Sequence, residues 1–364
     1  MKQLSRELLD FIRRSPSCFH VVENLKNELL VAGYTELRES ECWGVKPGGK
    51  YFVTRNGSSI IAFRVPEKVT GGFVMSASHS DSPSFKLKET AERRSAGCTQ
   101  LSTEGYGGML MATWFDRPLS VAGRVFVREG GKMVQKLVDI DRDLLIIPSV
   151  AIHMNRGANE GTKLLANVDT LPLYGGAEAG GIMPLAAASA GVAEGDILGK
   201  DLFLYCRTPG TVLGAAGEFI ASPKLDDLEC AFGCFRGFLA AEERGTIPVC
   251  CVFDNEEVGS ATKQGAGSVF LRDTLRRIIR YLHILCIHRT VTICQLSLSV
   301  RKYSDIRLRS PGIRWHRCRY CSAKQTCCYG FITFHFLPPL YNYCNCNTNT
   351  PKIKKYPQSK VKCY

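Results

Sequence analysis

The spacing of hydrophobic residues near the start of the chain predicts two helices. Residues 4–13 carry leucine, phenylalanine and isoleucine at helical spacing, which is typical of a short amphipathic helix. A Ser-Pro-Ser sequence then breaks the pattern, and Ser17 is suited to cap a second helix over residues 19–31. Gly33 follows and marks the end of that helix.

The next part of the chain has the periodicity of β-strands. Alternation over residues 51–54 and 59–64 predicts two strands. Residues 73–78 (FVMSAS) form an apolar run typical of a strand buried on both faces. That run delivers HSDSP at residues 79–83, and α/β sheets place their ligand sites at this carboxyl end of their strands. The run IPVCCV at residues 247–252 delivers FDNEEVGS in the same way.

The pattern changes between about residue 84 and residue 215. Few long helical patterns occur there, apart from a weak one over residues 183–193, and Gly-rich turns separate short β-like segments. These segments lie at residues 120–128, 132–138 and 202–207. Helical patterns return at residues 230–241 and 269–281. The sequence therefore predicts an α/β domain interrupted by a β-rich insert.

Composition divides the chain a second time, near residue 280. The 364 residues are 45% hydrophobic and 22% charged, as in an ordinary globular protein, but the net charge of +13 is not spread evenly. Residues 281–364 hold 14 Lys and Arg against one acid, Asp305, together with nine of the 17 Cys and two of the 34 Gly. Residues 1–280 are neutral, which argues against a nucleic-acid partner for this part.

The amino-terminal residues lack the apolar core of a secretory signal, and no apolar run in the chain approaches the length of a membrane span. We therefore expect a cytoplasmic protein without a membrane partner.

Two adjacent carboxylates, Glu256 and Glu257, follow the second apolar strand. Neighbouring side chains of an extended chain point to opposite faces, so one carboxylate could bind a metal ion while the other reaches a water molecule. Metal-assisted hydrolysis needs this division of roles. A solvated acidic turn is the alternative for such a pair taken alone.

Two other predicted element ends carry similar chemistry. His79 precedes Asp81 by two residues, so the carboxylate can orient an imidazole that binds metal. Asp226 and Asp227 form a second acidic pair. Each motif taken alone is compatible with a structural role, but together they indicate a metallohydrolase.

Five motifs taken in order resemble the M18 metalloaminopeptidases, the aspartyl aminopeptidase family, which removes acidic N-terminal residues from peptides. The resemblance covers roughly residues 4–281. The motifs lie at residues 79–83, 106–108 with 113–117, 151–156, 224–227 and 254–260.

The resemblance implies an incomplete three-layer α/β zinc-peptidase domain, interrupted by the β-rich insert, and two zinc ions. It implies His79 and Glu257 as terminal ligands of different ions and Asp226 as the bridging ligand. It makes Glu256 the general base and Asp81 the partner that orients His79. In related folds a cis peptide follows the bridging aspartate.

The resemblance also concerns the insert and the assembly. His153 matches a histidine that reaches the substrate site of a neighbouring subunit, although an ordinary strand histidine is an equally good interpretation. Members of the family assemble as dodecamers, so we expect a homo-oligomer.

The family pattern stops near residue 280. The resemblance implies two further metal ligands beyond this point, an aspartate followed by a His-containing run and a histidine near the C-terminus, and neither is found. We therefore interpret residues 281–364 as an aberrant Cys-rich basic tail, disordered or out of frame; a zinc ribbon and a nucleic-acid-binding tail are alternatives. The remaining predicted segments are the first catalytic part (1–83), the insert (84–217) and the second catalytic part (218–280).

Two functions follow from these observations. The first is a zinc aminopeptidase that acts on peptides, impaired because later ligands are missing. The alternative is a non-catalytic oligomeric remnant or binding module, which predicts assembly without metal dependence.

Overall fold

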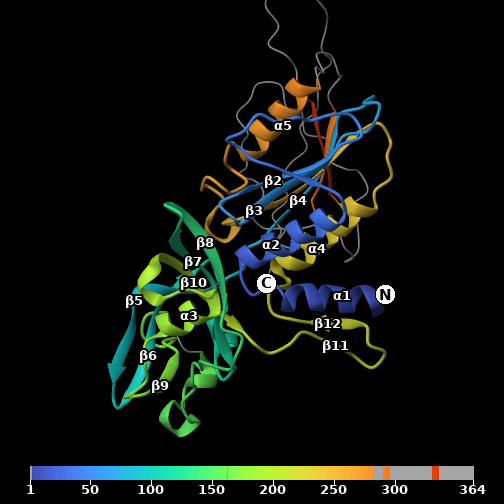
Figure 1. The fold of residues 1–364 in the computed structure, drawn as a ribbon. Helices are drawn as coiled ribbons and strands as arrows, with labels where there is room; N and C mark the ends of the chain where they lie inside the picture. Colours follow the sequence, from blue (N-terminus) through green and yellow to red (C-terminus); the bar gives the residue numbers. More distant parts are fainter. Residues whose placement is uncertain (1, 162, 283–289, 296–329, 336–364) are drawn as a thin grey trace, which may run out of the picture.

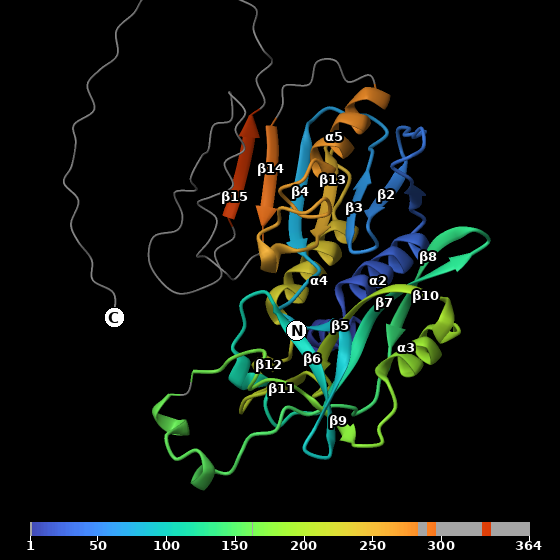
Figure 2. The ribbon, with the colours of Figure 1, turned by 90° about the vertical axis from the view of Figure 1, so that its left-hand side faces the viewer.

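The computed structural model describes residues 2–161, 163–282, 290–295 and 330–335, and these fold into two adjoining parts. One part is a sheet with helices on both faces, and the other is a largely antiparallel β-structure (Figure 1). The turned view in Figure 2 shows the β-rich part lying against one end of the first sheet.

The first sheet has, within the described residues, the strand order β1-β2-β3-β13-β4-β14-β15. Strand β13 is parallel to β4 on one side and antiparallel to β3 on the other. The bounds are β1 Thr35–Leu37, β2 Lys50–Arg55, β3 Ser59–Arg64, β4 Phe73–His79, β13 Ile247–Phe253, β14 Thr290–Gln295 and β15 Gly330–His335.

Helices cover both faces of this sheet and produce three layers (Figure 1). Strand β3 shows why, because its side chains alternate between the two faces. Ile60 and Ala62 pack with α1, α2 and α4, whereas Ile61 and Phe63 pack with α5. The bounds are α1 Lys2–Arg13, α2 Cys18–Val31, α4 Leu225–Ala240 and α5 Phe270–Tyr281.

The β-rich part is built on a second sheet, ordered β8-β7-β10-β5-β6-β9, whose neighbouring strands are antiparallel. Its core consists of aliphatic side chains and Phe85, with helix α3 packed against them. A short hairpin, β11–β12, leads back to α4. The bounds are β5 Ser84–Ser95, β6 Cys98–Tyr106, β7 Leu119–Glu129, β8 Lys132–Asp139, β9 Leu173–Gly176, α3 Ile182–Ala190, β10 Ile197–Cys206, β11 Thr211–Leu213 and β12 Phe219–Ala221.

The predicted fold class is confirmed, including its β-rich insert. The helices predicted over residues 4–13, 19–31 and 269–281 are present as α1, α2 and α5. Strands β5 and β6 were not predicted. A register shift between Leu87 and Glu92 interrupts the alternation of β5, and the buried face of β6 carries Thr99 and Thr103 beside Leu101, so it does not stand out as apolar. Short 3-10 helices lie at Met111–Trp114, Ile152–Met154, Ala158–Glu160, Glu194–Asp196 and Glu256–Val258.

Ser17 occupies the predicted N-cap position of α2, but it does not form a capping hydrogen bond. Ser17 precedes α2 in an extended conformation, yet its side chain makes no capping bond to the backbone. Its hydroxyl lies 2.8 Å from Nδ1 of His20 instead.

Strands β14 and β15 come from the segment predicted as an aberrant tail, and β14 pairs in parallel with β4. The rest of that prediction, including the zinc-ribbon alternative, lies outside the described residues. In the part of the chain that is described, no helix combines the length and hydropathy needed to cross a bilayer.

Candidate metal centre

The site forms where the carboxyl ends of β4 and β13 meet. These neighbouring strands run parallel and pair His79 with Phe253, so both chains leave the sheet at the same level. The amide of Ser80 donates to the Phe253 carbonyl at 2.7 Å and continues the pairing by one residue. Two polar loops that lie far apart in the sequence are thereby brought together.

His79 lies at the centre of the site and is 8% exposed. Its Nδ1 is 3.0 Å from the carbonyl oxygen of Asp81 and 3.2 Å from the Asp81 carboxylate. Both atoms are acceptors, so Nδ1 carries a proton and Nε2 is the atom available to a metal ion. Nε2 faces Asp226 Oδ1 at 3.3 Å and Glu256 Oε2 at 3.9 Å.

The acidic pair Asp226 and Asp227 lies at the start of α4. The peptide bond between them is cis, as expected, and neither residue has helical backbone angles. Both carboxylates lie near His79 Nε2, Asp226 at 3.3 Å and Asp227 at 3.7 Å, but they differ in burial. Asp227 is buried and accepts the His79 amide at 3.1 Å, whereas the Asp226 side chain is 60% exposed and faces Nε2.

Glu256 and Glu257 do not continue β13 as an extended chain. The expectation that their side chains point to opposite faces of an extended strand is therefore wrong. Asn255 adopts a left-handed conformation with φ of 61°, and the 3-10 helix Glu256–Val258 follows at once. Asparagine tolerates this conformation because its short side chain can form local hydrogen bonds. The turn brings both carboxylates near His79.

Burial and charge separate the carboxylates of the site. Burial raises the pKa of Glu257 to about 7, and the neighbouring Asp81, Asp226 and Glu256 carboxylates add to the effect. Burial likewise raises the pKa of Asp227 to about 6. The hydrogen bond from His79 instead lowers the pKa of Asp226.

The same surroundings also change the pKa of the His79 imidazole. Burial works against the charged ring, but the hydrogen bonds to Asp226 and Asp81 outweigh it and raise the pKa of His79 to about 11. A site with this much uncompensated negative charge favours a cation.

The donor set fits a zinc ion. Within the described residues two groups place their ligand atoms within 4.8 Å of one another, and His79 belongs to both. One group adds Glu256 and Glu257, and the other adds Asp226 and Asp227. Imidazole nitrogen and carboxylate oxygen are common zinc ligands, and Asp81 supplies the outer hydrogen bond that such a histidine needs.

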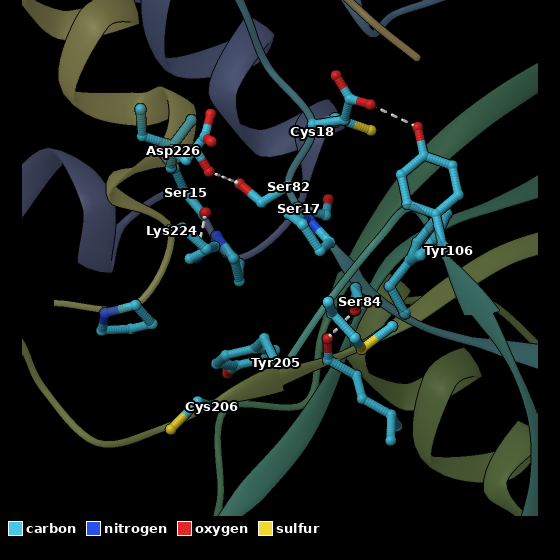
Figure 3. Close-up of a pocket in the computed structure, with 18 of the residues that line it drawn as sticks. Ser15, Ser17, Cys18, Ser82, Ser84, Tyr106, Tyr205, Cys206, Lys224 and Asp226 are labelled. Carbon is cyan, nitrogen blue, oxygen red and sulfur yellow. Dashed lines mark hydrogen bonds between the residues drawn. The ribbon is translucent and has the colours of Figure 1, made fainter. Parts of the chain in front are cut away.

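A cavity of about 850 Å³ opens beside these residues and is lined by both parts of the chain (Figure 3). The first part contributes Asp81, Asp226 and Lys224, and the insert contributes Tyr106 and Tyr205. The Lys224 ammonium donates to the Ser15 carbonyl at 2.6 Å, and burial lowers its pKa to about 7. This lysine ties the loop between α1 and α2 to the loop that carries Asp226.

The structure does not bring every predicted residue to this place. His153 lies on the exposed 3-10 helix Ile152–Met154 of the insert and, among the described residues, belongs to neither ligand group. The sequence interpretation included Tyr106 only as part of a motif, but its hydroxyl lies 2.6 Å from Asp81 Oδ2. Its position just before a Gly-Gly turn, at the end of a polar strand, was the available signal.

Comparison with known proteins identifies the family. The family model described as "Aminopeptidase I zinc metalloprotease (M18)" matches residues 11–300. The chain belongs to the M18 family. "Probable M18 family aminopeptidase 2" of Clostridium acetobutylicum is 43% identical over 287 residues, which cover 76% of this chain and 66% of that protein. The protein of the same name from Pseudomonas fluorescens is 38% identical over 285 residues, with the same two coverages. The M18 chain described here thus spans slightly less than two thirds of these relatives.

Solved structures show the same fold. The chain is similar to "Structure of Chaetomium thermophilum mApe1", with a TM-score of 0.71 and 36% identity over 77% of this chain and 68% of that one. It is also similar to "Cryo-EM structure of the Ape4 and Nbr1 complex", with a TM-score of 0.74 and 34% identity over 77% and 59%. The prediction of the M18 family from five motifs is therefore confirmed.

Proposed function

We propose that this chain carries the catalytic site of a zinc-dependent aminopeptidase. The observation that carries the proposal is the convergence of one buried imidazole and the carboxylates of Asp226, Glu256 and Glu257 at the meeting point of β4, β13 and α4. Membership of the M18 family supplies the reaction class. We propose His79, Asp226 and Glu257 as the metal ligands.

Zinc, when bound, supplies a Lewis acid that polarises the scissile carbonyl and makes a water molecule more acidic. We assign proton transfer and the orientation of the ligands to residues of the chain. Glu256 takes the proton of the attacking water and passes it to the amine that leaves. Its carboxylate suits this role because it faces His79 at 3.9 Å yet stays 34% exposed. Asp81 holds the His79 ring so that Nε2 faces the site.

The substrate, on this proposal, is a peptide whose first residue enters the cavity between the two parts. An acidic first residue follows from the family resemblance, and the lining includes Lys86, Arg117 and Lys224. Lys86 pairs with Asp201 at 3.0 Å, whereas Arg117 is exposed and, within the described residues, forms no ion pair. We assign the attraction for an acidic side chain to Arg117.

The chain is proposed to hold metal weakly. The two ligand groups of the described residues contain a single histidine, so two ions would share it or one would rely on carboxylates. The sequence analysis also expects further ligands to be missing, and this likewise predicts weak binding of the metal.

A homo-oligomer is proposed from a solved relative, "Structure of S. cerevesiae mApe1 dodecamer", at 26% identity. His153 would then serve the site of a neighbouring subunit, where its exposed position on the insert leaves it free to reach. A cytoplasmic location remains a prediction from the sequence.

The test uses the full chain supplied with zinc and compares release of the first residue from aspartyl and leucyl peptides. Wild type should favour the aspartyl peptide. Glu256→Gln should keep its zinc and lose about 10²–10⁴-fold in turnover, because it removes the base and leaves the ligands. Glu129→Gln, at an exposed ion pair of the insert, is the matched control and should match wild type. A wild-type chain that neither binds zinc nor cleaves either peptide would favour the non-catalytic alternative.

A further inference from the structure

The Asp81 carboxylate receives four hydrogen-bond donors, and one of them comes from the insert. Oδ1 lies 3.2 Å from the Glu256 amide and 3.2 Å from His79 Nδ1. Oδ2 lies 3.2 Å from the Glu257 amide and 2.6 Å from the hydroxyl of Tyr106. One buried carboxylate therefore holds the proposed general base, two proposed ligands and a residue of the insert in a common arrangement.

The chemistry of Asn255 fixes the direction of these hydrogen bonds. Its Oδ1 accepts from Thr262 Oγ1 at 2.8 Å and from Gln264 Nε2 at 2.8 Å, so the amide oxygen faces those two groups. Its Nδ2 must then donate to the Tyr106 oxygen, at 2.9 Å. The Tyr106 proton remains for Asp81, at the shortest of the four contacts.

Gly107, the next residue of the insert, also lies close to the Glu256–Glu257 turn. Gly107 has φ of 75°, and a Cβ atom there would lie 2.8 Å from Cβ of Glu257. The Tyr106 ring packs edge-on against Phe203 of β10, with centroids 5.5 Å apart, which fixes the phenol within the insert. Tyr106 and Gly107 thus form a rigid contact between the insert sheet and the Glu256–Glu257 turn.

We propose that Tyr106 is a positioning residue, through which the insert holds Asp81 and with it the backbone of Glu256 and Glu257. The inference rests on the proposed function, since it concerns the same site. It assigns the insert a part in shaping the metal centre of its own chain. The hydroxyl, rather than the ring, carries this role.

The test is Tyr106→Phe in the full chain, which keeps the ring on Phe203 and removes the hydroxyl. Tyr174→Phe is the matched control, because it removes a phenol hydrogen bond, to the Gly181 carbonyl at 3.1 Å, elsewhere in the insert. Amide hydrogen exchange is measured without metal. Exchange at residues 254–260 should become about tenfold faster in Tyr106→Phe and stay unchanged in Tyr174→Phe.

Zinc affinity, measured by competition with a chromophoric chelator, is the second readout. It should fall about tenfold in Tyr106→Phe, at the low end of the effect of direct partners of metal ligands, because Tyr106 acts through Asp81. Unchanged exchange at residues 254–260 overturns the inference whatever the affinity. Faster exchange spread over β2 and β3 as well also overturns it, because that outcome means general destabilisation. If wild type binds no zinc, the proposed function fails, but the exchange experiment still decides the role of Tyr106.

Discussion

Replacing Asp81 by asparagine isolates the contribution of one carboxylate to the site. The amide has a single accepting oxygen, so two of the four donors around residue 81 lose their acceptor. Of the two possible orientations of the new side-chain amide, the more favourable one places its Nδ2 atom toward Tyr106 and the Glu257 amide. The Tyr106 hydroxyl can rotate and accept, but the Glu257 N–H then faces another donor.

The magnitude follows from these contacts. One buried amide without an acceptor costs about 1–3 kcal/mol, and the three remaining bonds weaken because the acceptor is neutral. Removing the charge also relieves its repulsion of Asp254 and Glu257, which offsets part of the loss. We therefore expect about 2 kcal/mol less unfolding free energy and about 10–100-fold weaker zinc binding.

Guanidinium unfolding followed by circular dichroism and zinc competition by a chelator measure the two quantities. Asp139→Asn is the control, since the Asp139 carboxylate also accepts a tyrosine hydroxyl, from Tyr205 at 2.7 Å, but within the insert. It should leave zinc affinity unchanged. The reasoning is refuted if Asp81→Asn unfolds at the wild-type denaturant concentration and binds zinc as tightly.

Three further predictions concern the surroundings of the site. Burial lowers the pKa of half-buried His20 to about 4 from 6.5, so the unfolded chain takes up a proton first as the pH falls and stability is lost. Between about pH 7.5 and about pH 5, wild type should lose about 1 kcal/mol more unfolding free energy than His20→Gln; equal losses would contradict this. Arg124→Met removes a buried guanidinium that donates to Asp201 at 2.9 Å and lies 4.1 Å from an aromatic ring of α2. Denaturant unfolding should show that the free energy of unfolding falls by about 3 kcal/mol. A fall below about 1 kcal/mol would contradict this prediction. Gly107→Ala forces a Cβ against Glu257 at positive φ and should weaken zinc binding at least about tenfold by chelator competition, whereas wild-type affinity would show that the turn can yield.

Much of the fold could be predicted from local patterns. The helices over residues 19–31 and 269–281 each show one apolar stripe, because each packs on a single face of the sheet. Strand β4 could be placed because it is nearly continuous in apolar character, as expected of a strand inside a sheet, although Val74 is exposed and burial on both faces is incomplete. Strands β5 and β6 could not be placed in this way, since a register shift interrupts the alternation of β5 and threonines occupy two of the three buried positions of β6.

The structure brings His79 together with the acidic residues proposed for the site, but the turn that does so was not predicted. The roles of these residues as ligands and base stay predictions. His79 and Glu256 could be associated because parallel strands end at one edge of a sheet. The turn at Glu256–Val258 could not, because it depends on Asn255 holding a left-handed conformation through Thr262 and Gln264. The expectation of an extended Glu-Glu pair treated the sequence as if the strand continued.

The sequence by itself determined the family to which the chain belongs, the strands that lead into the site and the polar residues that we propose for it. These are properties of periodicity and of short motifs, and they act over a few residues. Only the tertiary structure decided that Asp81 joins His79, both glutamate amides and Tyr106, through contacts that span up to 176 residues of chain. Such contacts exist only once the sheet is closed and the insert is packed against it, because a single hydrogen bond cannot offset the entropy of ordering so long a loop.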